Sequence, residues 1–320
     1  MKKDNPVDDM TLEKLVRIDS IQTVHSRTED GYVDITLLPF LPGIFVTFND
    51  VHTTVVPTGD YLRDKDVMLI NYCISGRCEF RISDNDYRYV KDNFTSVGSL
   101  VIYDRFYYPS AFYQGFEIYI YKKLFTDETL RMLEGLHIDM DRLYEEYGYK
   151  DHLSILKTDI RIQRLWMELY EASRPDKGLI LINILKILYL LTNSARSIPA
   201  NNSYLTRDQV NLAKEVQHIL TEDVSKHIPM REIALRLNTS ESSLKNYFSA
   251  MFGMSVSEYM KKERLKKASA LLTQTRLPIS DIAVSCGFSN QGRFAKVFKE
   301  EYGVSPLEYR RKEYSLADKW

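Results

Sequence analysis

The chain has 320 residues, of which 44% are hydrophobic and 27% charged, and its formal net charge is −1. This composition is typical of globular proteins that bury a core, and the length favours about two domains. The sequence has no run of 18 apolar residues, no apolar segment near its start and only three cysteines. These features argue against a membrane span, a secretion signal and a disulfide framework, and we expect a cytoplasmic protein.

Strand patterns dominate the chain up to residue 123. Residues 1–20 are polar, and we expect either a mobile arm or a short helix there. Short apolar or alternating runs predict strands at 33–38, 44–49, 67–74, 77–83, 86–91, 99–103 and 115–121. Turn residues, among them Gly43, Gly76, Asn85 and Gly98, separate these runs. Short strands joined in series indicate a small β-barrel or sandwich over 21–123.

Helical patterns follow at 124–134, 152–172 and 178–195. The run from Leu179 to Leu191 is apolar on most faces, so a helix there must be buried. Such a helical pair suits a dimer interface, although packing against the predicted barrel explains the pattern equally well. Residues 1–196 are therefore predicted to form one domain, with its barrel at 21–123 and its helices at 124–196. Residues 197–205 read as a linker, and 206–320 as a second domain.

The second domain contains a duplicated segment. Ile233 and Ala234 recur as Ile282 and Ala283 at an offset of 49, and Phe248 recurs as Phe298 at an offset of 50. Each copy has the pattern of a helix-turn-helix, with units at 229–252 and 279–302. Asn238 and Gly287 stand at the sharp turns, where a residue must tolerate positive φ. Ser240 and Ser289 are the predicted N-caps of the second helices, and Gly253 and Gly303 are their predicted ends.

Between the two copies, 255–272 predicts one helix of about 27 Å. Since neighbouring major-groove segments of DNA lie about 34 Å apart, a rigid helix of this length suits two recognition helices that enter one DNA molecule. Charge agrees with this interpretation. Residues 201–320 carry 19 Lys and Arg against 14 Asp and Glu, whereas residues 1–200 carry 24 against 30. A basic domain is what phosphate contacts require.

The C-terminal motifs resemble those of AraC/XylS-type transcriptional regulators. The resemblance covers about 206–312 and is most specific at 279–283, 287–291, 294–299 and 303–310. It implies an all-α domain of about seven helices with two helix-turn-helix units, in a sequence-specific regulator that is more often an activator. It further implies an α+β chain with a cupin-like N-terminal domain for effector binding and dimerisation. Gly292 departs from the family pattern, since a polar residue is usual there.

Exposed positions in the first two turns of a recognition helix read base edges. The predicted base contacts are Ser242, Ser243, Lys245, Asn246, Asn290, Gln291, Arg293 and Lys296. The predicted phosphate contacts are Lys299, Arg310 and Arg311. Arg293 suits guanine and Gln291 suits adenine. The expected partners are double-stranded DNA, a second copy of the chain and, for an activator, RNA polymerase.

Effector binding rests on less specific signals. Aromatic residues are dense between 103 and 125, where they suit either a ligand platform or an apolar core. Arg77, Arg105, Tyr103 and Tyr119 are the candidate effector contacts. The alternative function is an effector-free or protein-sensing regulator, whose N-terminal domain serves only for dimerisation or partner contacts.

Enzyme functions find little support in the sequence. The six histidines do not share strand-like segments as cupin metal ligands would, so we expect neither a metal site nor a cofactor. Cys73 and Cys78 flank a predicted hairpin and form a possible redox pair, but nothing near them predicts an activated thiol for a repair enzyme.

Overall fold

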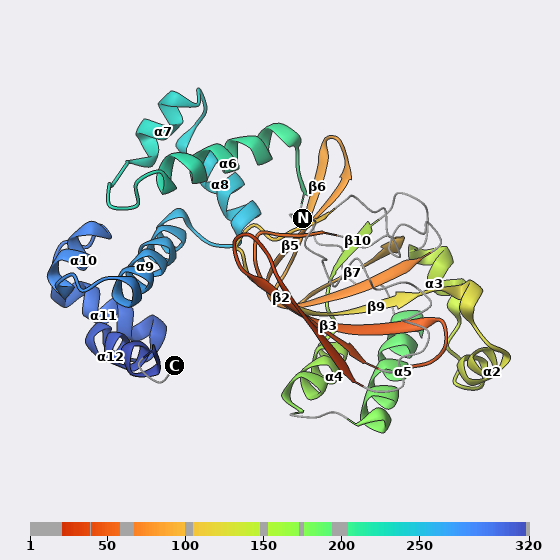
Figure 1. Cartoon of the computed structure of the whole chain (residues 1–320). Helices are drawn as coiled ribbons and strands as arrows, with labels where there is room; N and C mark the ends of the chain where they lie inside the picture. The colour runs from red at the N-terminus through yellow and green to blue at the C-terminus, as the bar shows by residue number, and fades with distance from the viewer. Residues whose placement is uncertain are drawn as a thin grey trace, which may run out of the picture. The chain divides into compact units, whose positions relative to one another are not determined.

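The computed structural model describes residues 21–38, 40–57, 67–99, 105–147, 153–172, 176–193 and 204–317 (Figure 1). It divides into two compact units, residues 1–207 and 208–320. The predicted arm at 1–20 and the predicted linker up to residue 203 lie outside the described residues. The first unit contains a sheet and the second is helical, as the α+β prediction requires.

An antiparallel sheet organises the described part of the first unit. Its strands are β1 (Gln22–Arg27), β2 (Tyr32–Leu38), β3 (Ile44–His52), β4 (Val55–Pro57), β5 (Met68–Ser83), β6 (Asp86–Lys91), β7 (Phe94–Ser99), β8 (Arg105–Tyr107), β9 (Tyr113–Ile120), β10 (Leu153–Lys157) and β11 (Tyr204–Leu205). They pair in the order β1-β2-β3-β9-β5-β6-β11, with β7 and β8 also paired to β5. Among the described strands this path does not return on itself, so the predicted barrel is not closed.

Strand β5 corrects two predictions. The sequence suggested a hairpin between Cys73 and Cys78, but both cysteines lie on one strand of 16 residues. A bulge between Cys73 and Ser75, followed by Gly76 at φ 89°, bends the strand instead of reversing it. The half before the bulge pairs with β7 and the half after it pairs with β6. Gly98, predicted as a turn, lies within β7 and pairs with Leu69.

Helices α2 (Asp127–Gly135), α3 (Met140–Tyr147), α4 (Ile160–Glu171) and α5 (Lys177–Asn193) follow the strands, after a short 3-10 turn at Lys122–Leu124. The helix predicted over 152–172 begins only at Ile160, because Asp159 caps it and residues 153–157 form β10 against β7. Figure 1 shows α4 and α5 along one face of the sheet. There Trp166 stacks on Phe116 with ring centroids 4.8 Å apart.

Helix α5 is buried along most of its length, as its apolar sequence predicts. Ile180, Ile184 and Ile187 have no exposed surface and contribute to the core between the sheet and the helices. In the same helix Ile182 keeps 64% of its surface exposed and Tyr189 keeps 42%. Among the described residues nothing covers these two apolar side chains, which flank the exposed Lys186 on one face of α5.

Seven helices follow one another between residues 207 and 317. They are α6 (Arg207–Thr221), α7 (Met230–Arg236), α8 (Glu241–Phe252), α9 (Val256–Gln274), α10 (Ile279–Ser285), α11 (Gln291–Tyr302) and α12 (Pro306–Ala317). Helix α9 corresponds to the predicted linker helix. It begins at Ser255, whose hydroxyl accepts from the Glu258 amide while the Glu258 side chain reaches back to the Ser255 amide.

Candidate nucleic-acid interface

The two helix-turn-helix units are α7–α8 and α10–α11. In each unit the first helix has seven residues and buries an Ile-Ala pair: Ile233 with Ala234, and Ile282 with Ala283. The small alanine side chain lets the second helix cross closely. Both turns have the predicted left-handed residue, at φ 48° for Asn238 and 79° for Gly287.

The N-cap of the second recognition helix differs from the prediction. Ser240 caps α8 as expected, since its hydroxyl accepts from the Ser243 amide at 3.1 Å. In the other unit Asn290, and not Ser289, caps α11, with its side-chain oxygen accepting from the Arg293 amide at 2.8 Å. The second turn is thus one residue longer than the first. From the caps onward, residues of α8 and α11 correspond at a constant offset of 50.

Most of the predicted base-contacting residues of α8 lie on its exposed face. Ser242, Lys245 and Asn246 of α8 are exposed, while Leu244 and Phe248 are fully buried on the opposite face. The ammonium of Lys245 pairs with the Glu241 carboxylate one turn earlier. The Ser243 hydroxyl contacts Ser240 at 2.8 Å, so this half-buried side chain belongs to the cap.

Helix α11 presents a more basic surface. Gln291, Arg293, Lys296 and Lys299 are all exposed, above the buried Phe294 and Phe298. Within the described residues none of these three cations forms an ion pair. The Asn290 side-chain oxygen already serves the cap, which leaves only its amide nitrogen for a base.

Of the predicted phosphate contacts, Arg310 has a visible structural role. Its guanidinium donates to the Leu277 carbonyl at 2.7 Å, which ties α12 to the segment that precedes α10. Arg311 is exposed at the same end of α12.

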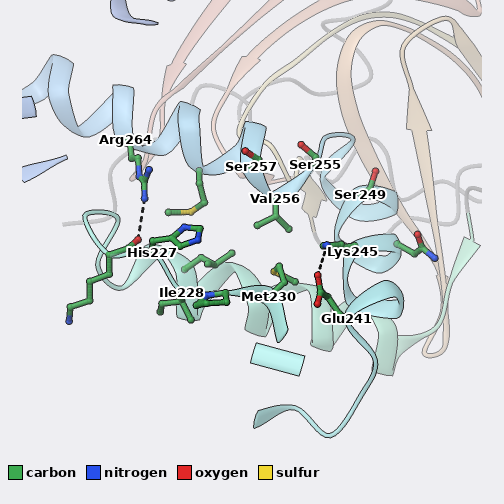
Figure 2. Close-up of a pocket in the computed structure, with 15 residues that line it drawn as sticks. His227, Ile228, Met230, Glu241, Lys245, Ser249, Ser255, Val256, Ser257 and Arg264 are labelled. Atoms are coloured by element: carbon green, nitrogen blue, oxygen red, sulfur yellow. Dashed lines mark hydrogen bonds and ion pairs between the residues drawn. The ribbon is translucent and has the colours of Figure 1, made fainter. Parts of the chain in front are cut away.

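A groove of about 660 Å³ runs beside α8 (Figure 2). One wall is formed by the exposed side of α8, the other by the segment 226–230 and the start of α9. Basic or hydroxyl side chains line the groove from all three: Lys226, His227, Lys245, Ser249, Ser255, Ser257 and Arg264. Ile228, Val256 and Met260 supply apolar lining. The sequence reasoning missed Lys226, His227 and Ser257, because they lie outside the recognition helix and only the fold brings them beside it.

The candidate effector residues do not form one site in the described structure. Tyr119 is buried and donates its hydroxyl to Glu117. Arg77 is buried elsewhere, 5.9 Å from the centroid of the Tyr89 ring, and burial lowers its pKa. Tyr103 and the side chain of Arg105 lie outside the described residues.

Around Glu117 the structure places a buried polar cluster that sequence reasoning missed. Asn71 donates to the Glu117 carboxylate at 3.2 Å and accepts from the Tyr113 hydroxyl at 3.0 Å. Burial raises the pKa of Glu117, although hydrogen bonds from Tyr119, Asn49 and Asn71 oppose the shift. Nearby polar atoms of Thr47 and Asn49 are buried without a partner in the described part of the chain. A carboxylate inside an otherwise apolar strand was the available sequence signal.

Three general properties of the described residues bear on function. No three His, Cys, Asp or Glu side chains converge as metal ligands in the ranges described. None of the described helices combines the length and the apolar character that a bilayer span needs. Cys73 and Cys78 are fully buried, and burial raises the pKa of both thiols, which disfavours the reactive thiolate.

Comparison with known proteins identifies the C-terminal region. Residues 233–312 match the family model of a helix-turn-helix domain. The chain is 33% identical over 106 residues to the Msm operon regulatory protein of Streptococcus mutans, which covers 33% of this chain and 37% of that protein. It is 34% identical over 97 residues to the transcriptional activator RhaR of Yersinia pseudotuberculosis, covering 30% and 33% of the two chains. The match thus spans only about a third of these relatives.

Solved structures match over the same region. The C-terminal domain of the response regulator AraT from Geobacillus stearothermophilus is 31% identical and aligns with 32% of this chain and 84% of its own, at a TM-score of 0.30. The xylose-binding transcription activator XylR is 25% identical and aligns with 40% of this chain and 37% of its own, at a TM-score of 0.29.

Proposed function

We propose that this chain, whose C-terminal third is an AraC/XylS-type helix-turn-helix region, is a sequence-specific DNA-binding regulator of transcription. One observation supports the proposal most directly. Helices α8 and α11 have matching side-chain caps, buried aromatic faces and glycine ends, and both expose polar or cationic residues on the opposite face. A repeated scaffold with an exposed, hydrogen-bonding face is what base recognition requires.

The two recognition helices would enter neighbouring segments of the major groove. Helix α9, with 19 residues, is about 28 Å long, close to the repeat of about 34 Å between such segments. In α8 the base readers would be Ser242, Lys245 and Asn246. In α11 they would be Gln291, Arg293 and Lys296, with Asn290 limited to its amide nitrogen.

Phosphate contacts would flank the recognition helices. The groove beside α8 presents Lys226 and His227 next to the hydroxyl of Ser257, and these groups are suitable donors for a DNA backbone that passes along it. Lys299 and Arg311 would take this role near α11. Arg310 is already bonded to a backbone carbonyl, and its contribution would be smaller.

We further propose that the first unit senses a small molecule and dimerises. The buried cluster around Glu117, with unpartnered polar atoms at Thr47 and Asn49, supports a polar effector in a cupin-like domain. The exposed apolar side chains of Ile182 and Tyr189 on α5 support a homodimer. The regulator would act in the cytoplasm, as an activator that contacts RNA polymerase. A regulator without an effector is the alternative, and calorimetry of the full chain against candidate metabolites separates the two.

Footprinting on the DNA upstream of the chain's own gene tests the proposal. We expect each protomer to protect two major-groove segments about one helical turn apart. Protection of only one segment per protomer, or of none, would contradict it. Once the site is known, Arg293→Ala should lower specific affinity by about tenfold to a hundredfold, the worth of one base contact, with non-specific binding nearly intact.

The matched control is Arg236→Ala. Arg236 is also an exposed arginine of a helix-turn-helix unit, but it lies on α7 and pairs with Glu232. It should leave the ratio of specific to non-specific binding unchanged. An unchanged ratio for Arg293→Ala would remove the base-reading role of that residue.

A further inference from the structure

The turn between α6 and α7 is organised by Asp223. Its carboxylate accepts from the Ser225 amide at 3.1 Å and from the Ser225 hydroxyl at 2.6 Å. The Lys226 amide donates to the Asp223 carbonyl at 3.1 Å, which closes the turn. The backbone carbonyl groups of Val224, Ser225 and Lys226 contact residues that come later in the chain, on α9 and in the turn before α11.

Arg264, in the middle of α9, binds two of these carbonyls. Its Nε donates to Val224 at 2.8 Å and its Nη2 donates to Lys226 at 3.1 Å. Figure 2 shows the guanidinium reaching from α9 toward the segment that leads into α7. These two hydrogen bonds therefore link the middle of the linker helix to the segment that precedes the first helix-turn-helix unit.

The turn between α10 and α11 lies against the same backbone carbonyls. A Cβ added to Gly287 would lie 2.8 Å from the Ser225 oxygen, 2.9 Å from the Val224 oxygen and 3.0 Å from the Arg264 Nε. Such distances leave no room for a side chain. Residues 223–226, Arg264 and Gly287 thus form one contact within residues 208–320. This contact joins the first helix-turn-helix unit, the linker helix and the second helix-turn-helix unit.

We propose that Arg264 is a positioning residue that holds α8 and α11 at a fixed separation and orientation. The proposal rests on the proposed DNA-binding function. A linker helix fixes the length between the two units but does not by itself prevent rotation about its ends. The gain from linking two binding modules depends on the stiffness of the link, because a stiff link raises the effective concentration only for targets at the matching distance.

Lys267 provides a matched control. It is a cation on the same helix, and its ammonium donates to the Ser285 carbonyl at 2.9 Å. That bond joins α9 to α10, whose residues share one apolar core with the second half of α9. Removing Lys267 therefore deletes a cation and a hydrogen bond to a carbonyl without loosening one helix-turn-helix unit from the other.

The test uses the full chain and operator duplexes in which zero, one or two base pairs are inserted between the two protected segments. Wild-type protein should lose at least about tenfold in affinity with each insertion. Arg264→Ala should bind the native spacing more weakly and discriminate between spacings several-fold less, and Arg264→Lys should restore part of the discrimination. Lys267→Ala should keep the wild-type spacing profile.

A short duplex that carries only the α8 segment reports on folding. Arg264 lines the groove beside α8 and binds the Lys226 carbonyl, so Arg264→Ala should bind this short duplex somewhat more weakly than wild type. The spacing profile is a ratio of affinities between duplexes, so that loss cancels in it. An Arg264→Ala variant that still binds the short duplex and keeps the wild-type spacing profile would overturn the proposal. An Arg264→Lys variant that is no better than Arg264→Ala in a folded domain would also overturn it. Wild-type protein that binds no duplex at all would instead refute the proposed function.

Discussion

Gly287→Ala should destabilise the second helix-turn-helix unit by about 3 kcal/mol. A left-handed φ of 79° costs a residue with a Cβ about 1–2 kcal/mol. The new methyl would also meet the carbonyl oxygens of Ser225 and Val224 at 2.8 and 2.9 Å, and forcing an atom into a packed site costs about 1–3 kcal/mol. The lower entropy of the unfolded alanine chain returns about 0.5 kcal/mol.

Asn238→Ala is the matched substitution in the first helix-turn-helix unit. Asn238 has a φ of 48°, but it is exposed and already carries a side chain, so alanine there meets only the conformational cost of about 1 kcal/mol. Hydrogen exchange of peptides from residues 279–302 and 230–252 measures both effects in the full chain. Exchange protection should fall about 150-fold for Gly287→Ala and about fivefold for Asn238→Ala. Equal losses would show that the close contact at Gly287 carries no energy.

Three further outcomes follow from the described contacts. Asn290→Ala should cost about 1 kcal/mol in α11 while Ser289→Ala changes thermal stability little; the reverse order would restore Ser289 as the cap. Burial raises the pKa of Glu117 above its usual 4.5, so wild-type stability in urea should fall as pH rises past 4.5, and Glu117→Gln should lose that slope; an unchanged slope would contradict the assignment. Burial alone would raise the pKa of Asp30, but hydrogen bonds from Thr53 and Thr54 hold it at about 2. Stability should therefore fall as pH drops from 3.8 to 2 in wild type but not in Asp30→Asn, and parallel acid profiles would refute this.

The C-terminal helices were predictable because their signals are local. A cap, a left-handed turn residue and a C-terminal glycine each act within one helical turn, and the duplication supplied every signal twice. The cap of α11 was the exception. Ser289 and Asn290 are equally good caps, so only the length of the turn decides between them, and the packing of Phe288 and Phe294 in one core fixes that length.

The first unit was less predictable, because strand pairing is not local. Ser75 and Gly76 have the composition of a turn, yet pairing with β9 on both sides of the bulge keeps β5 continuous. Residues 153–157 have an apolar pattern that fits a helix as well as a strand, and β7 decides between them. Strands β1 and β7 are too polar for their periodicity to stand out. Glu117 becomes buried, with a raised pKa, only because β9 pairs with β3 on one side and β5 on the other.

The additional residue in the second turn matters for anyone who exchanges parts between the two units. An offset of 49 aligns α7 with α10 but sets α11 one residue out of phase, which is about 100° of rotation around the helix axis. A chimera spliced at that offset would turn the aromatic face of the transplanted helix about 100° away from the core, so Phe294 and Phe298 or their equivalents would no longer point into it. Grafts that change operator preference should therefore keep each turn together with its own recognition helix, from Asn238 or Gly287 onward.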